Sequence, residues 1–86
     1  MNSAEIQEAV YQWAVNNQFG APYGVIVGEG KNQKGTKHKN VTFGRCRTLD
    51  AMVSIFNRNF IMVVTNRHGK QVFKSYDELM IFLNTL

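Results

Sequence analysis

The sequence lacks the features that would place a protein outside the cytoplasm or in a membrane. Its 86 residues include a single cysteine, Cys46, which permits no internal disulfide and fits a reducing compartment. The apolar run from Phe60 to Val64 is far shorter than the roughly 20 residues that a membrane-spanning helix needs. The N-terminus is acidic, whereas a secretory signal peptide begins with basic residues and continues with an apolar stretch. We therefore expect a cytoplasmic protein that does not bind a membrane.

Residue patterns for catalysis or metal binding are also missing. His38 and His68 fall in different predicted loops, and with only Cys46 beside them they do not have the ligand spacing of a zinc site. The Cys46 thiol is predicted to face inward, where it would behave as a small hydrophobe instead of a nucleophile. Acid pairs such as Asp77 and Glu78 are explained as helix-start residues. We expect neither an enzyme nor a bound metal or other cofactor.

Proline is as scarce as cysteine, with Pro22 the single example. The chain has seven glycines and a hydrophobic fraction of 44%, which argues against global disorder. A chain of this length supports only one hydrophobic core. We therefore expect a single folded domain over residues 1–86.

Positive charge is absent from one part of the chain and concentrated in another. Residues 1–30 contain no Lys or Arg, whereas residues 31–74 hold all ten Lys and Arg and one acid, Asp50, which is a formal charge of +9. Six of the ten lie in the polar, Gly-rich stretch from Gly28 to Arg47. Concentrated positive charge attracts phosphates, so this segment predicts a polyanion site. The alternative is an ordinary solvated basic surface.

The first half of the chain predicts a helix followed by two strands. Residues 3–18 have apolar residues at helical spacing, and Asn2 or Ser3 can cap the helix. If Asn2 is the cap, Glu5 can reach back to its amide. Residues 23–27, which are rich in β-branched side chains and bounded by Gly, predict a strand, and residues 40 to 45 or 46 predict a second. The basic stretch between them predicts a loop of about a dozen residues, which is long for a hairpin and typical of functional loops.

In the second half, the pattern predicts a helix, a hairpin and a final helix. Thr48 resembles a helix cap, and the apolar stripe after it predicts a helix that ends near Asn57. Residues 60–65 and 70–74 predict a hairpin in which Gly69 supplies a positive φ. The last helix begins after a capping box that is formed by Ser75 and Glu78.

The two halves show a possible internal repeat. Residues 74–84 align without gaps on residues 47–57, which favours two ββα units, at 23–57 and 60–85, after the N-terminal helix. The predicted fold is therefore α+β with the order αββαββα, and a four-stranded, mostly antiparallel sheet carries the helices. Alternatively, strand-to-helix junctions simply share this residue pattern.

Period-2 alternation assigns the predicted strand residues to two faces. Cys46 and Phe73 would point toward the helices. The outer face would mix cations with apolar groups, namely Phe43, Arg45, Arg47, Phe60, Met62, Val64, Val72 and Lys74. Monomers rarely expose so large an apolar patch, so we expect the N-terminal helix, a second subunit or a ligand to cover it.

The stretch Phe43-Gly-Arg-Cys-Arg-Thr-Leu-Asp-Ala-Met52 resembles the strand-to-helix junction of AP2-type DNA-binding domains. The resemblance covers ten residues and does not include the family's middle strand with its Trp and Arg. It implies a strand that leads into a helix and a sheet that contacts DNA. In style, the short, Asn-rich, Met-containing chain is also similar to accessory proteins of large bacteriophages, which implies a viral accessory role.

Two functional hypotheses follow from these patterns. The first is a small basic module that binds the phosphate backbone of DNA or RNA through its cations and interleaved aromatic residues. Its predicted contact residues are Lys31, Lys34, Lys37, His38, Lys39, Phe43, Arg45, Arg47, Arg67, Lys70 and Lys74. The alternative is a small protein-binding regulator or inhibitor that uses the outer sheet face or the N-terminal helix, either as a homodimer or against an acidic protein surface.

Overall fold

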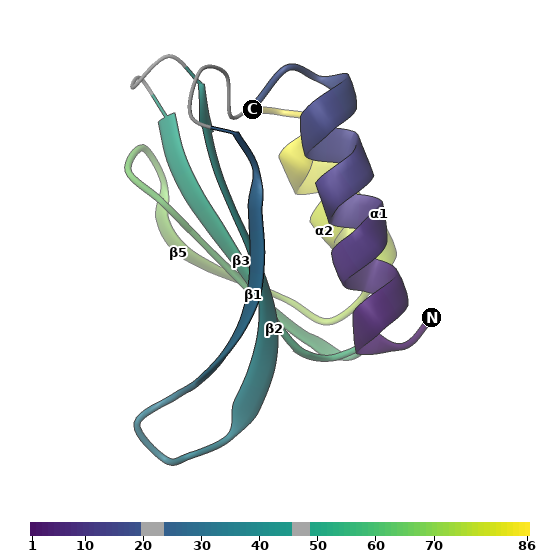
Figure 1. The fold of residues 1–86 in the computed structure, drawn as a ribbon, viewed down its shortest axis with the longest axis vertical. Coiled ribbons are helices and arrows are strands. Elements are labelled where there is room, and N and C mark those ends of the chain that lie inside the picture. Colours follow the sequence, from purple (N-terminus) through teal and green to yellow (C-terminus); the bar gives the residue numbers. More distant parts are fainter. Residues whose placement is uncertain (20–23, 46–48) are drawn as a thin grey trace.

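Two layers make up the structure, a computed structural model that describes residues 1–19, 24–45 and 49–86. One layer is a five-stranded sheet, and the other consists of two helices that both lie on the same face of that sheet (Figure 1). The elements in chain order are α1 (Ser3–Asn16), β1 (Ile26–Lys31), β2 (Lys37–Arg45), β3 (Leu49–Asn57), β4 (Phe60–Thr65), β5 (Gly69–Phe73) and α2 (Tyr76–Leu83).

The sheet is an antiparallel meander in which every strand pairs with its neighbours in the sequence. Because side chains alternate along a strand, paired residues such as Val41, Val53 and Val63 point to the same face. That face packs on the helices and forms a core whose members are fully or almost fully buried, among them Ile6, Val10, Val41, Phe43, Val53, Ile55, Ile61, Val63, Leu79 and Leu83.

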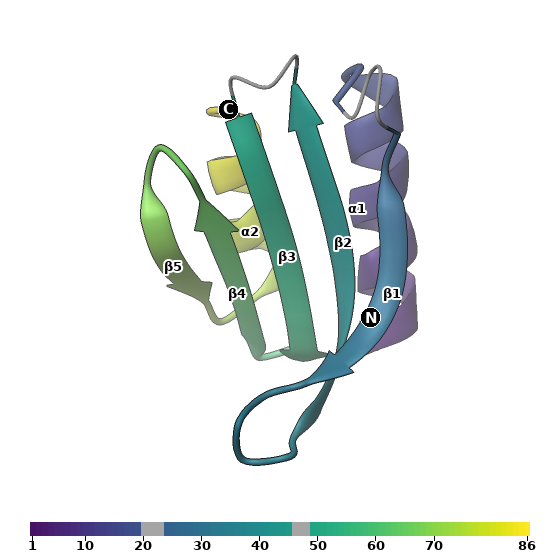
Figure 2. The ribbon, with the colours of Figure 1, turned by 60° about the vertical axis from the view of Figure 1, so that its left-hand side comes forward.

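The other face of the sheet, which we call the open face, is covered by neither helix (Figure 2). The alternate strand residues point to it, including Ile26, Met52, Met62, Val64 and Val72. Of the three covers predicted for this face, the N-terminal helix is wrong, because α1 packs on the opposite side of the sheet.

Both helices begin at the predicted caps. The Asn2 side chain accepts a hydrogen bond from the Glu5 amide, and the Glu5 carboxylate accepts one from the Asn2 amide, both at 2.9 Å. The Ser75 hydroxyl accepts from the Glu78 amide at 3.1 Å. Helix α1 ends at Asn16, slightly before the predicted end. Neither helix in the described part of the chain is long and apolar enough to cross a membrane.

The predicted helix at residues 48–57 is wrong, because residues 49–57 form β3. Ala51, Val53 and Ile55 are buried at every second position, and Met52 between them is 39% exposed. Apolar residues on both faces of the strand imitated the apolar stripe of a helix, and pairing with β2 and β4 decided between the two.

Because residues 49–57 form a strand, the predicted repeat and strand count also differ from the structure. The class α+β, the antiparallel sheet and the N-terminal helix are confirmed, but the sheet has five strands and the order is αβββββα. Strands β4 and β5 followed by α2 match the predicted ββα unit at 60–85, whereas β1, β2 and β3 stand where the ββα unit at 23–57 was expected, so the two segments do not repeat. Phe43 and Ala51 pair across β2 and β3, so the described residues of the stretch that resembles a strand-to-helix junction, 43–45 and 49–52, belong to two paired strands. Cys46 and Thr48 lie outside the described residues.

The predicted β4–β5 hairpin is confirmed. Strand β4 has the predicted bounds, and Gly69 has a φ of 66°, in the left-handed region that favours glycine. Ile61 pairs with Phe73, so Phe73 points to the helix side of the sheet, as predicted.

Candidate nucleic-acid interface

The basic stretch forms a long hairpin instead of a long loop. Strands β1 and β2 pair as far as Lys31 and Lys37, so only five residues connect them, at 32–36. The Asn32 side chain shapes this turn, because its Oδ1 accepts hydrogen bonds from the amides of Lys34 and Thr36, both at 2.9 Å. The backbone of Asn32 also donates to the Thr36 carbonyl at 3.0 Å. Lys34 is therefore presented from a hydrogen-bonded turn.

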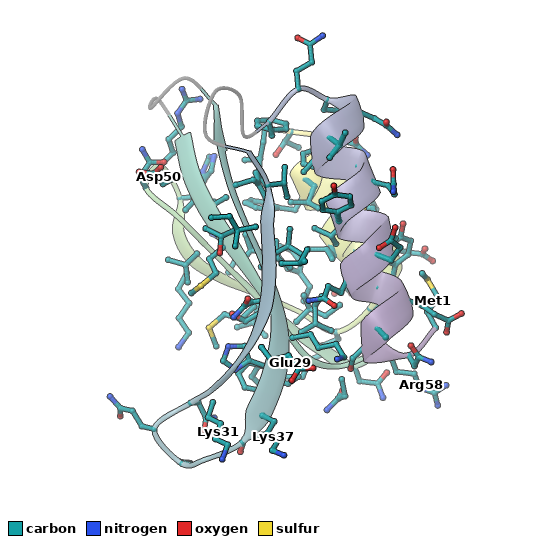
Figure 3. The ribbon with its side chains drawn as sticks, in the orientation of Figure 1. Met1, Glu29, Lys31, Lys37, Asp50 and Arg58 are labelled. Atoms are coloured by element: carbon teal, nitrogen blue, oxygen red, sulfur yellow. The ribbon has the colours of Figure 1, made fainter. Side chains whose placement is uncertain are left out.

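The hairpin projects beyond the rest of the sheet and bends toward the side of the open face (Figures 1 and 2). Lys31 and Lys37 lie near its tip, directly opposite each other on the two strands (Figure 3). Like charges in directly opposite positions destabilise a sheet. Together with Lys34 in the turn, they make the tip an exposed concentration of positive charge.

Lys39, one register step nearer the body, is neutralised. Its Nζ lies 2.6 Å from Oε1 of Glu29 on the neighbouring strand. This hydrogen bond, then the charge of Lys39 and, less strongly, that of Lys37, lower the pKa of the Glu29 carboxyl. Glu29 therefore stays ionised and offsets one lysine. The Lys39–Glu29 contact is the single ion pair among residues 1–19, 24–45 and 49–86, so none of the three lysines at the tip is in an ion pair.

His38 belongs to a row of aromatic rings on the open face. Its ring centroid lies 4.9 Å from that of Phe56, and Phe56 lies 5.1 Å from Phe60, so the row crosses β2, β3 and the start of β4. Gly30 makes room for it, since a Cβ atom there would lie 3.1 Å from His38 Nε2. The His38 Nδ1 atom is buried and has no hydrogen-bond partner in the described structure.

A groove separates the turn of the hairpin from the open face. Its volume is about 650 Å³, and its wall on the hairpin side includes Lys34 and Thr36. The opposite wall includes Phe56, Phe60 and Lys70. Sequence reasoning missed Phe56 and Phe60 as site residues, because the first was assigned to a helix and the second only to a general apolar patch. Only the bend of the hairpin brings these segments together.

Phe43 was predicted to face outward, and this is wrong. It is only 3% exposed and lies on the helix side of β2, together with Val41. Its ring centroid is 5.9 Å from that of Trp13 and 5.5 Å from that of Phe19. Trp13 in turn donates a hydrogen bond from Nε1 to Asn84 Oδ1 at 2.9 Å. Phe43 is therefore a core residue and cannot stack on a ligand.

The other predicted contact residues are not gathered at the hairpin tip. Arg67 lies in the β4–β5 loop, where the amide of Asn66 donates to the Asp50 carbonyl, and Asp50 is at the far end of the molecule from Lys31 and Lys37 (Figure 3). Lys70 lies on β5, across the groove from Lys34. Lys74 follows β5, Arg45 ends β2, and Arg47 lies outside the described residues.

The open face carries a broad exposed apolar surface. The exposed fractions of its side chains are 64% for Ile26, 39% for Met52, 42% for Phe60, 39% for Val64 and 50% for Val72. No group of three or more His, Cys, Asp or Glu side chains that could hold a metal ion occurs within the described ranges. The surface therefore offers apolar contacts and lysines.

Comparisons with known proteins give no family for the chain. No protein-family model matches it, and neither a curated protein nor a solved structure is significantly similar to it. The functional assignment therefore rests on the residues and their geometry.

Proposed function

We propose that the protein is a small nucleic-acid-binding module whose β1–β2 hairpin holds the phosphate backbone of DNA or RNA. The supporting observation is the charge of the projecting tip, because none of Lys31, Lys34 and Lys37 forms an ion pair within the described structure. Lysines at such a tip can reach phosphates without moving the body of the protein. A bound phosphate would also relieve the repulsion between Lys31 and Lys37.

The expected strength follows from counterion release. Each phosphate that a protein neutralises contributes about −0.9 to the log-log salt slope on duplex DNA and about −0.7 on a single strand. Three lysines therefore account for a slope of about −2.7 on duplex DNA, which is a loss of about 40-fold in affinity between roughly 50 and 200 mM salt. A two-stranded ribbon of this kind is also narrow enough for the major groove.

The test is fluorescence anisotropy of labelled single- and double-stranded DNA and RNA, titrated with the protein at several salt concentrations. In the test variant, Lys31, Lys34 and Lys37 are all replaced by Gln. We expect the variant to lose about 2.7 of the slope on duplex DNA or about 2.1 on a single strand. Its stability should not fall, because the change removes a like-charge pair from a sheet edge.

A variant with Arg58→Gln, Arg67→Gln and Lys74→Gln is the matched control, because it loses the same net charge at positions away from the tip. We expect it to keep most of the slope of the unmodified protein. Equal losses in the two variants would show that binding follows net charge and does not depend on the hairpin. Absence of salt-dependent binding in the unmodified protein would refute the proposal as a whole.

The uncovered open face favours a second candidate, a protein-binding regulator or inhibitor whose first partner is a second copy of this chain. Five strands about 4.8 Å apart span about 19 Å between the two outer strands, which is wide enough for much of the roughly 800 Å² per partner of a stable interface. Burial of Ile26, Val64 and Val72 would then drive dimer formation.

Sedimentation equilibrium tests this candidate. A dimer would have twice the monomer mass of 9.8 kDa, and Val64→Lys, on the β4 part of the open face, should return it to the monomer. A protein that stays monomeric up to roughly 0.1 mM, well above the Kd of a standard-size interface, would exclude the dimer. An acidic protein surface is a further possible partner of the hairpin lysines, and it would be displaced by the same salt concentrations.

A further inference from the structure

We infer that the groove between the hairpin turn and the open face takes a single strand of nucleic acid, with one base on Phe60 and phosphates on Lys34 and Lys70. This inference rests on the proposed function and adds to it the class of nucleic acid and the place of the bases. It shares Lys34 with the phosphate contacts of the tip but adds Phe60 and Lys70, which lie outside the tip, so it can fail separately.

The shape of the groove fits a strand that runs across the end of the sheet. The hairpin bends over the side of the open face, so the turn and the β3–β4 end of the sheet form two walls (Figure 2). The volume of about 650 Å³ lies within the range of small-molecule sites, so the groove has room for a base and its sugar. It is partly open to solvent, so a polymer can enter it and continue beyond it.

Phe60 provides a face on which a base can stack. Its side chain is 42% exposed, and Phe56 packs against it with an interplanar angle of 74°. The His38 ring packs against Phe56 in turn, so the Phe60 ring has support from two neighbouring strands. An aromatic ring held in this way loses little freedom when a base stacks on it. Stacking on aromatic side chains is a general way of binding unpaired bases.

The charges in the groove match the backbone of such a strand. Lys34 lies on the hairpin wall and Lys70 on the β5 side, and no Asp or Glu lines the groove. Gln33 adds an amide that can donate to and accept from the edge of a base. A phosphate on either side of a stacked base would therefore find a lysine, without repulsion from a carboxylate.

A single strand fits better than a duplex for a geometric reason. The base faces of a duplex are stacked on one another, so only its backbone and groove edges are available to a protein. A duplex could meet the lysines of the hairpin tip but could not place a base on Phe60 inside the groove. The lining of the groove therefore predicts a preference for single strands, whereas the tip alone does not.

The test compares Phe60→Leu with the unmodified protein on three labelled probes. These are oligothymidylate and oligouridylate of about 12 nucleotides and a DNA duplex of the same length. The variant should lose about 5- to 150-fold in affinity for both single strands, which is the range for one stacked base. Its affinity for the duplex should stay within about twofold of that of the unmodified protein. Its salt slope should stay the same, since no charge changes.

Tyr11→Leu is the matched control, because it removes an aromatic ring from α1 on the other side of the sheet. It should bind all three probes as the unmodified protein does. Lys70→Gln is a second probe of the groove and should lower the slope on single strands by about 0.7. The thermal midpoint of each variant, measured by circular dichroism, shows that it is folded at the temperature of the titrations.

The possible outcomes separate this inference from the proposed function. Salt-dependent binding with equal affinity for single strands and duplex, unchanged by Phe60→Leu, would overturn the inference and leave the proposed function intact. The inference would also be overturned, and the proposed function left intact, if Phe60→Leu converts a dimer to a monomer without changing the affinity for any probe. No binding to any probe at low salt would overturn both. Selective loss of single-strand affinity in Phe60→Leu alone would support both.

Discussion

The assignment of β3 as a strand predicts an order of stability effects that a helix would reverse. Ile55 and Met52 are three residues apart on this strand, and we consider the replacement of each by Ala. Ile55 is fully buried against the helices, whereas Met52 is 39% exposed on the open face. A helix with the apolar stripe of residues 49–56 would bury Met52 and leave Ile55 outside the stripe.

The magnitudes are far enough apart to measure. Truncation of a buried Ile to Ala costs about 2–5 kcal/mol, because contacts are lost and a cavity remains. A domain of 86 residues has a free energy of unfolding of about 4–13 kcal/mol, so Ile55→Ala removes a large share of it. Met52→Ala also introduces Ala, but on the exposed face of the strand, and should lower the free energy of unfolding by less than about 1 kcal/mol.

Urea unfolding followed by circular dichroism gives both values, provided that the m-value does not change between the variants. If Ile55→Ala does not fold, Ile55→Val is the milder substitution and should cost about 0.5–1.5 kcal/mol. That corresponds to a fall of about 2–12 °C in Tm for a domain of this size. A larger loss for Met52→Ala than for Ile55→Ala would refute the strand assignment and the open face with it.

Two further predictions concern the attachment and the charge of the hairpin. Gln7 of α1 donates from Nε2 to the carbonyls of Gly28 and Asn40, both at 3.0 Å, so Gln7→Leu should cost about 1–3 kcal/mol and speed hydrogen exchange first in β1 and β2. Equal protection in the variant would show that these bonds do not hold the hairpin. Glu29→Gln should free Lys39 and steepen the duplex salt slope by about 0.9. The ordinary pKa of the Glu29 carboxyl is 4.5, and this pKa is lowered in the folded protein. The contribution of the ionised Glu29 to stability is therefore complete above pH 4.5 and is lost as the pH falls through the lowered pKa. The difference in stability between protein and variant should therefore vanish only in acid, and a difference that changes near pH 7 would contradict this.

The sequence alone determined the features that depend on residues close together in the chain. The caps at Asn2 and Ser75 need only a side chain and amides within one helical turn, and both are where the pattern placed them. The hairpin after β4 needs only a glycine at a position of positive φ, which Gly69 supplies. The concentration of lysines between residues 31 and 39 is likewise a property of composition.

Only the tertiary structure decided the features that depend on distant neighbours. Residues 49–57 are apolar on both faces, so their spacing fits a helix or a strand, and pairing with β2 and β4 selects the strand. The same pairing turns Phe43 into the core and Phe60 toward the groove, because the face of a side chain changes with a shift of one residue in register. Which lysines stay free also depends on the partner across the strand, as the pairing of Lys39 with Glu29 shows. The sequence therefore specified the charge of the hairpin, and the packing of the sheet specified what lies beside it.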